Sequence, residues 1–232
     1  MFRPAGGGKV GAPIHPMKID ASLTPQGLRK KTARVFELAG RKIRDLDASW
    51  DPAQGTPVFT VRGRYTSRGW TEWTQGFQFG MAFLQFDATG DDAMLRLGRD
   101  KTVRFMASHV SHVGVHDHGF NNISTYGNLR RLMLEGRIPS NRDELNFTEV
   151  ALKASGAVQA ARHVPTACRD PWSPVAGPGG VVPAGYVYSF NGPHSLFADT
   201  IRSLRVLGIS HQLGHCLMGE RDRKISLLAR LL

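Results

Sequence analysis

Helical spacing of apolar residues is the feature that most limits what this chain can fold into. In TPQGLRKKTARVFELAGRKIRDL (residues 24–46), apolar side chains recur with a period near 3.6, after a Thr24-Pro25 start that is typical of a helix N-terminus. We expect further helices at about 73–87, 91–108, 119–135, 143–163, 195–215 and 220–231. Between helices, residues 48–69 leave room for a short hairpin, whereas 165–185 hold too much Pro and Gly for regular structure. The sequence therefore predicts an all-α fold of about seven helices.

Length and terminal composition set the expected domain organisation. The chain has 232 residues, of which 41% are hydrophobic, and this is enough for a packed core. Residues 1–20 carry four Gly and three Pro and are expected to form an irregular arm, with residues 21–232 as one domain. The N-terminus has no apolar targeting segment, and no run of eighteen apolar residues occurs. We therefore expect a cytoplasmic protein with no membrane partner.

The charge predicts attraction to polyanions. The formal net charge is +11 and the pI is near 10.3, so nucleic acid and acidic polysaccharide are both candidate partners. The basic residues are scattered, and the longest run is only Arg29-Lys30-Lys31. A basic, helical nucleic-acid-binding protein is thus supported by net charge alone, and we expect no nucleic-acid partner. Two cysteines without a CxxC pair do not predict a disulfide framework.

Four histidines surround one aspartate in SHVSHVGVHDHGFNN, which raises the question of a metal site. The spacing of His109, His112, His116 and His118 matches no standard zinc pattern. For His109 and His112, a place at a helix C-terminus, where the dipole favours cations, is the simpler explanation. His116 and Asp117 precede Gly-Phe and a new helix, so an acid there can meet a ligand in a cleft at the helix ends.

A second histidine pair lies in HQLGH at residues 211–215. His211 and His215 are four residues apart and would share one helix face. A zinc metalloprotease needs a glutamate as general base where Gln212 stands. The pair is therefore interpreted as part of helix packing, and neither metal nor organic cofactor is expected.

Three segments, in this order, resemble the unsaturated glucuronyl hydrolases of glycoside hydrolase family 88. WTEWTQGFQFGMAFLQFDATGDDAML (70–95) resembles the family's W-T-x-G-F segment with its later TGD, and HDHGF (116–120) resembles its H-D-x-G-F loop. GYVYSFNGPHSLFADTIRSLRVLGISHQLG (185–214) resembles the region where an Asp opens an inner helix. The resemblance covers about residues 20–232. It implies an incomplete (α/α)6 barrel of the six-hairpin glycosidase type, with the site in a funnel of helix-end loops.

The resemblance also implies the chemistry. Family members remove unsaturated uronic acid from the non-reducing end of oligosaccharides that polysaccharide lyases generate. An acid protonates C4 of the C4=C5 double bond, water adds at C5, and the hemiketal rearranges and releases the aglycone. One carboxyl group can carry out both proton transfers if its pKa lies near the working pH. No cofactor is needed, and the partner is an oligosaccharide that carries an unsaturated uronic acid.

Site residues follow by matching positions. The resemblance implies that Asp199 is the general acid/base and that Asp117 is the second essential Asp, which holds sugar hydroxyls and tunes its partner. It implies that His116 donates a hydrogen bond to substrate and that Trp73 and Phe190 stack on the sugar. From the residues alone, a helix N-cap or a first-turn position, which the helix dipole favours, explains the aspartates, and core packing explains the aromatic rings.

The sequence also departs from the family pattern. Phe190 stands where a Trp is usual, Gln75 stands where many relatives have an acid, and the stretch from residue 190 to 199 is shorter. The sequence ends at ERDRKISLLARLL with about seven of twelve barrel helices, so we expect either self-association or a missing C-terminal half. Two further readings stay open: a non-catalytic remnant that only binds carbohydrate, and an unsaturated rhamnogalacturonyl hydrolase of family 105, which the H-D-x-G-F loop disfavours.

Overall fold

The computed structural model describes residues 20–69, 72–165, 176–177, 180–181, 185–190, 192–218 and 224–226. The irregular arm expected at residues 1–20 lies outside this range, apart from its last residue. The chain divides into two compact units, Met1–Val35 and Phe36–Leu232. In the first unit, the Thr24 hydroxyl accepts a hydrogen bond from the Gly27 amide at 3.0 Å, and Pro25 opens helix α1. This is the helix start that the Thr-Pro pair predicts.

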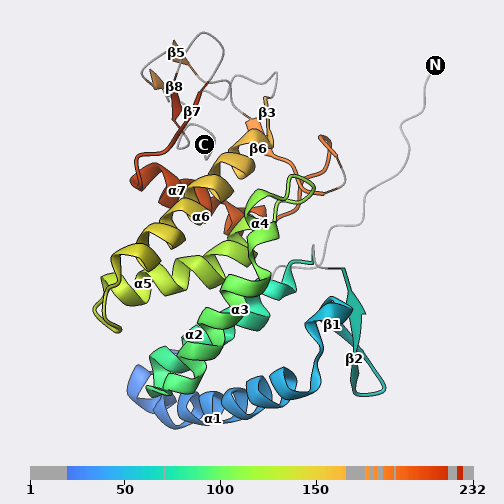
Figure 1. The fold of residues 1–232 in the computed structure, drawn as a ribbon, viewed down its shortest axis with the longest axis vertical. Coiled ribbons are helices and arrows are strands. Elements are labelled where there is room, and N and C mark those ends of the chain that lie inside the picture. The colour runs from blue at the N-terminus through green and yellow to red at the C-terminus, as the bar shows by residue number, and fades with distance from the viewer. Residues whose placement is uncertain are drawn as a thin grey trace, which may run out of the picture. The chain divides into compact units, whose positions relative to one another are not determined.

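The elements follow one another as helices with short strand pairs between them (Figure 1). Helix α1 (Pro25–Ser49) and the 3-10 turn η1 (Pro52–Gln54) precede a hairpin of β1 (Thr56–Val61) and β2 (Arg64–Arg68). Then come α2 (Thr74–Thr89), α3 (Asp92–Phe105), α4 (Ala107–Ser111), the π-helix η2 (Gly119–Gly127), α5 (Asn128–Leu134), α6 (Arg142–Ala161) and α7 (Thr200–Gln212). The other strands pair antiparallel: β3 (His163–Pro165) with β6 (Gly185–Val187), β4 (Ala176–Gly177) with β5 (Gly180–Val181), and β7 (Cys216–Met218) with β8 (Lys224–Ser226).

The helical prediction is confirmed, with corrections near the C-terminus. Residues 224–226 form strand β8 where a helix was expected, and α7 begins at Thr200 and not at 195. Helix α7 ends at Gln212 because Gly214 follows with a left-handed φ of 73°, a conformation that stops helices. His211 and His215 therefore do not share a helix face, and His211 is exposed. The Pro- and Gly-rich segment holds the short strands β4 and β5.

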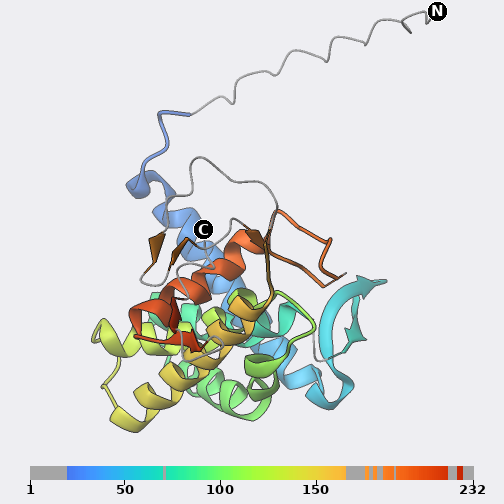
Figure 2. The ribbon, with the colours of Figure 1, turned by 90° about the horizontal axis from the view of Figure 1, so that it is seen from above.

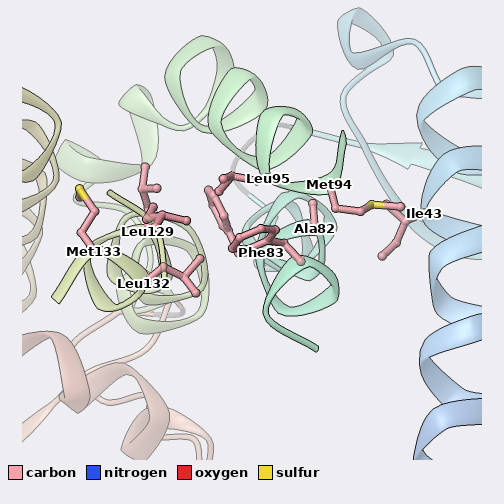
Figure 3. Close-up of a cluster of buried hydrophobic side chains, with 10 residues drawn as sticks. Ile43, Ala82, Phe83, Met94, Leu95, Leu129, Leu132 and Met133 are labelled. Carbon is pink, nitrogen blue, oxygen red and sulfur yellow. The ribbon is translucent and has the colours of Figure 1, made fainter. Parts of the chain in front are cut away.

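One cluster of buried apolar side chains joins α1, α2, α3 and α5 (Figure 3). Phe83 of α2 lies at its centre and is fully buried, between Leu129 and Leu132 on one side and Met94 and Ile43 on the other. Burying a Phe or Leu side chain contributes about 1.5–3 kcal/mol, so this cluster is a main source of stability. The TGDD turn connects two of these helices: Gly90 ends α2, and the Asp91 carboxylate caps α3.

A second cluster of buried apolar side chains joins α2, η2, α6 and α7. It contains Phe79, Met106, Tyr126, Ala151, Leu152 and Val206, from α2, η2, α6 and α7 and the residue before α4. Helices α6 and α7 lie side by side in both ribbon views (Figure 1 and Figure 2). This cluster therefore holds η2 and α7, which carry candidate site residues or directly follow them, against α2 and α6.

Candidate active site

Two glycines bring three helix beginnings together. A Cβ on Gly119, the first residue of η2, would lie 2.4 Å from the Arg202 carbonyl oxygen in α7. A Cβ on Gly76, in the first turn of α2, would lie 2.2 Å from the Asn121 Cα in η2. Neither contact is possible for a larger residue. The Gly of HDHGF and the Gly of the WTQGF segment thus let α2 and α7 pack directly on η2.

At this junction one imidazole lies beside both candidate carboxylates. His116 Nε2 is 3.3 Å from an Asp117 side-chain oxygen and 3.6 Å from an Asp199 side-chain oxygen. The His116 side chain is 1% exposed and that of Asp117 is 10% exposed, whereas the Asp199 side chain is 51% exposed. The structure therefore places one buried and one accessible carboxylate at the same ring nitrogen.

The Asp199 side chain does not serve the helix that it precedes. Asp199 occupies the N-cap position of α7, but its carboxylate makes no capping hydrogen bond, and its backbone is already helical. Asp199 thus lies at the helix start, as the alternative explanation expects, but its side chain does not cap the helix. Its carboxylate contacts His116 and is half-exposed to solvent, as a group that meets a ligand must be.

Thr200 fixes the orientation of the His116 ring. The Thr200 hydroxyl lies 3.1 Å from His116 Nδ1, and both groups are buried. In the neutral imidazole this hydroxyl can donate to Nδ1, which leaves the proton on Nε2, toward the two carboxylates. Sequence reasoning missed Thr200, although it directly follows Asp199.

An apolar wall stands next to this group. Phe190 and Phe197 stack with ring centroids 5.2 Å apart, and each centroid lies 6.3 Å from that of the His116 ring. Phe190 is 52% exposed and Phe197 is 42% exposed, so core packing does not explain Phe190. Phe197 was not predicted, and its place two residues before Asp199 was the available signal.

Trp73 lies in a separate aromatic group. Its ring contacts Phe77 and Phe120 edge-on, with centroids 5.7 and 6.0 Å away, and Trp73 is 45% exposed. Phe120 follows Asp117 by three residues, so the group adjoins the same loop. The structure brings His116, Asp117, Asp199 and Phe190 together, whereas a part for Trp73 in stacking on substrate stays a prediction.

Behind the loop, His118 belongs to a buried polar network. His118 Nδ1 is 2.8 Å from the Ser155 hydroxyl, and Nε2 is 2.8 Å from the His112 carbonyl oxygen. The Asn122 amide donates to the same Ser155 hydroxyl at 2.9 Å. Burial lowers the pKa of His118 to about 4. The neutral ring therefore holds the HDH segment to helix α6.

His109 is also neutral, contrary to expectation. Its Nε2 lies 2.5 Å from the Gln75 side-chain oxygen, and His109 is 3% exposed. Burial first, and then the nearby His112 and His118, lower the pKa of His109 to about 4. His109 does lie in the last turn of α4, as expected, but the helix dipole does not stabilise a neutral ring there as it would a cation. Gln75, which replaces an acid of the family pattern, is thus an uncharged partner for a buried imidazole.

Arg162 links the two segments that enter the site. Its guanidinium donates to the carbonyl oxygens of Val113, Tyr188 and Ser189 and stacks on the Tyr188 ring at 4.1 Å. Val113 lies shortly before His116 and Ser189 directly before Phe190. Burial lowers the pKa of Arg162, which is 2% exposed. No feature of the sequence indicated this residue.

Other kinds of site find less support. Within the described ranges, no three His, Cys, Asp or Glu side chains are placed to hold one metal ion. A hollow of about 460 Å³ between η2–α5 and α7 is lined by none of the candidate residues. In the described part of the chain, no helix has the length and apolar character to cross a membrane.

The fold is similar to two solved structures of unsaturated glucuronyl hydrolases. One, described as specific for heparin, has a TM-score of 0.56 at 16% identity over 78% of this chain and 42% of that chain. The other, from Streptococcus agalactiae, has a TM-score of 0.54 at 16% identity over 87% of this chain and 47% of that chain. No protein-family model and no curated protein matches the sequence.

This likeness identifies the class of fold. The chain is all-α and forms part of an (α/α) barrel like those of the two glycosidases, as the sequence predicted. It spans less than half of the length of either solved chain.

Proposed function

We propose that this chain carries the acid/base site of a glycosidase that removes unsaturated uronic acid from the non-reducing end of lyase-generated oligosaccharides. The observation that carries the proposal is the pair of carboxylates at His116 Nε2, one exposed and one buried. The likeness of the fold to two unsaturated glucuronyl hydrolases supports it.

Asp199 has the accessibility that the proton transfers need. In its protonated form it donates to C4 of the C4=C5 double bond, and the resulting carboxylate then takes a proton from the water that adds at C5. The product is a hemiketal at C5. Its collapse breaks the bond from C5 to the ring oxygen and leaves a ketone at C5 and a hemiacetal at C1, which expels the aglycone as an alcohol.

Asp117 and His116 act as the fixed side of the site. Asp117 is buried beside His116, and Thr200 holds the other nitrogen of the ring. In the tautomer in which Thr200 donates to Nδ1, the proton on His116 Nε2 is directed at the carboxylates and at any hydroxyl that lies between them. The Phe190–Phe197 pair offers an apolar face to the sugar ring on the side next to Asp199.

The test compares unsaturated with saturated substrates. Purified chain is incubated with unsaturated disaccharides from chondroitin, hyaluronan, heparin and pectin lyases, each beside its saturated counterpart, and aglycone release is followed by mass spectrometry. Release from at least one unsaturated substrate and from no saturated one is the expected result. Equal release from saturated disaccharides would point to ordinary glycoside hydrolysis, and binding without release would favour a carbohydrate-binding remnant. Release that is confined to the pectin-derived substrates would favour the rhamnogalacturonyl alternative.

A further inference from the structure

One face of the β1–β2 hairpin is exposed, apolar and basic. Side chains alternate between the faces of a hairpin, so Phe59 and Val61 of β1 share a face with Arg64 and Arg68 of β2. Phe59 is 58% exposed and Val61 is 59% exposed. The Arg68 guanidinium lies over the Phe59 ring at 5.3 Å. We call these four residues, with Arg62 in the turn, the hairpin surface.

The hairpin surface carries positive charge without compensation. Residues 52–71 contain no Asp or Glu. On the helices, by contrast, Arg99, Arg130 and Arg131 each contact a carboxylate. Within the described ranges, none of the three hairpin arginines forms an ion pair. An anionic partner would supply the missing charge.

Arg62 adopts a backbone conformation with positive φ that residues other than glycine rarely adopt. Arg62 and Gly63 form the two-residue turn, with φ of 50° and 76°, and Arg62 is the single non-glycine residue with positive φ in the described part of the chain. Such turns favour Asn-Gly or Asp-Gly because the Cβ of most other residues lies too close to the backbone at positive φ. An arginine in this place puts a cation at the tip of the hairpin, and an observed backbone outlier of this kind points to function.

The hairpin is also fixed in place near the candidate site. On its opposite face the Tyr65 ring contacts Trp50 edge-on at 6.4 Å, and Trp50 Nε1 donates to the Gly55 carbonyl oxygen at 2.9 Å. Strand β2 ends at Arg68, and α2 begins only six residues later. The first turn of α2 packs on η2 at Asn121, four residues after Asp117. A short segment therefore connects the hairpin to the helix beginning that packs on the loop of the candidate site.

We propose that the hairpin surface binds an anionic carbohydrate chain through the carboxylate or sulfate groups of that chain. Guanidinium groups bind such anions in a bidentate manner, and the apolar side chains between them can contact sugar rings. Single-stranded nucleic acid fits less well, because base stacking needs an open aromatic face and Arg68 covers that of Phe59. The choice of carbohydrate rests on the proposed function, and it extends the recognised ligand beyond the terminal sugar.

The test uses two matched triple variants of the full chain. One is Arg62→Asn, Arg64→Ser and Arg68→Ser; the control is Arg41→Ser, Arg96→Ser and Arg104→Ser, on exposed helix positions. Both lower the formal net charge by three. Because Asn suits the turn, the hairpin variant should melt no lower than the native chain. Calorimetry with saturated heparin, chondroitin sulfate or polygalacturonate then measures binding without any turnover.

We expect the hairpin variant to bind the polymer about tenfold more weakly and the control to change less than about twofold, since each exposed arginine contributes a few-fold. Activity on an unsaturated disaccharide should stay unchanged in both. An equal loss of affinity in the two triple variants would mean that net charge alone explains binding, and it would overturn the hairpin site. Tighter binding of an oligonucleotide of equal charge at the same residues would overturn the assignment to carbohydrate.

Failure of this inference and failure of the proposed function look different. A chain that cleaves unsaturated disaccharides but binds no saturated polymer overturns the hairpin site alone. A chain without activity whose polymer binding depends on the hairpin arginines supports the site and rejects only the hydrolysis.

Discussion

The two candidate carboxylates differ in how far the fold depends on them. Asp117 is buried among the residues that close the loop, whereas Asp199 is half-exposed and makes no capping bond at the start of α7. A half-exposed side chain that makes no hydrogen bond to its own helix can be replaced at little cost in stability. Asp199 has such a side chain.

Asp199→Asn should therefore leave the free energy of unfolding within about 0.5 kcal/mol of the native value, as exposed substitutions do. If the carboxylate capped α7, Asp199→Ala would cost about 1 kcal/mol while Asp199→Asn restored the cap. Urea unfolding of both variants separates these cases. A clear loss for Ala that Asn repairs would contradict the description of this side chain.

The buried histidines predict acid sensitivity. Folding lowers the pKa of His109 and of His118 from 6.5 to about 4, mainly by burial. Below pH 6.5 these histidines bind protons in the unfolded chain but not in the folded chain. The free energy of unfolding therefore decreases as the pH is lowered from about 6.5 to about 4. Each pKa unit corresponds to about 1.4 kcal/mol, so the combined loss is of the order of several kcal/mol.

Thermal unfolding between pH 4 and pH 8 checks this. The native chain should lose stability steadily below pH 6.5, and His118→Gln, which keeps a donor and an acceptor but cannot be protonated, should lose less over the same range. An identical pH slope in both proteins would show that His118 is not the group responsible.

At the scale of elements, the site depends on close approach of helices. Gly119→Ala forces η2 away from α7, since the added Cβ would meet the Arg202 carbonyl and the Ser203 Cα. Overpacking of this kind costs about 1–3 kcal/mol. Gly208 in α7 is the matched control, because a Cβ there meets nothing within 4 Å. Gly208→Ala should stabilise by about 0.5–1 kcal/mol.

Chemical unfolding of the two alanine variants measures the difference, and it should have opposite signs. Gly119→Ala should also lower activity in the folded protein, because it separates Asp199 from His116. Equal stability of the two variants would mean that the contact between η2 and α7 is looser than described.

The link between the loop before His116 and the strand before Phe190 is a second element-scale feature. Arg162→Met keeps the bulk of the side chain but leaves three carbonyl oxygens without their donor. The bond to Ser189 is buried, whereas those to Val113 and Tyr188 are only partly buried. Because one buried unsatisfied acceptor costs about 1–3 kcal/mol, we expect a loss of about 1–3 kcal/mol in urea unfolding. Arg162→Lys should recover part of it, and a loss below about 1 kcal/mol for Met would show that solvent reaches these carbonyls.

For the whole molecule, the sequence predicted the fold class and the order of the helices better than it predicted the side-chain contacts between them. Amphipathic spacing and caps such as Thr24 and Asp91 act locally, so they predicted most of the helices, and the turn-rich composition of residues 48–69 predicted the β1–β2 hairpin. The motif resemblance named His116, Asp117, Asp199 and Phe190, and the structure brings these residues together. Phe197, Thr200 and Arg162 act only through contacts across the fold, and the buried state of His109 depends on helix packing. Such contacts leave no periodic signal in one dimension.

The length of the chain bears on what the whole molecule can do. It spans less than half of each solved glucuronyl hydrolase that it resembles. Self-association, or completion by a further segment, stays a prediction for that reason. The carboxylate pair and its supporting network nevertheless lie within the described residues of this chain, so their chemistry can be tested on it directly.

The most direct test follows ultraviolet absorbance of the conjugated double bond in an unsaturated uronyl disaccharide, with native chain, Asp199→Asn and Asp117→Asn. We predict that the native chain abolishes the absorbance and that Asp199→Asn, while equally well folded, slows this loss by about 10²–10⁴-fold, the usual contribution of a general acid/base. Persistent absorbance with the folded native chain on every lyase product, or an unimpaired Asp199→Asn, would contradict the account.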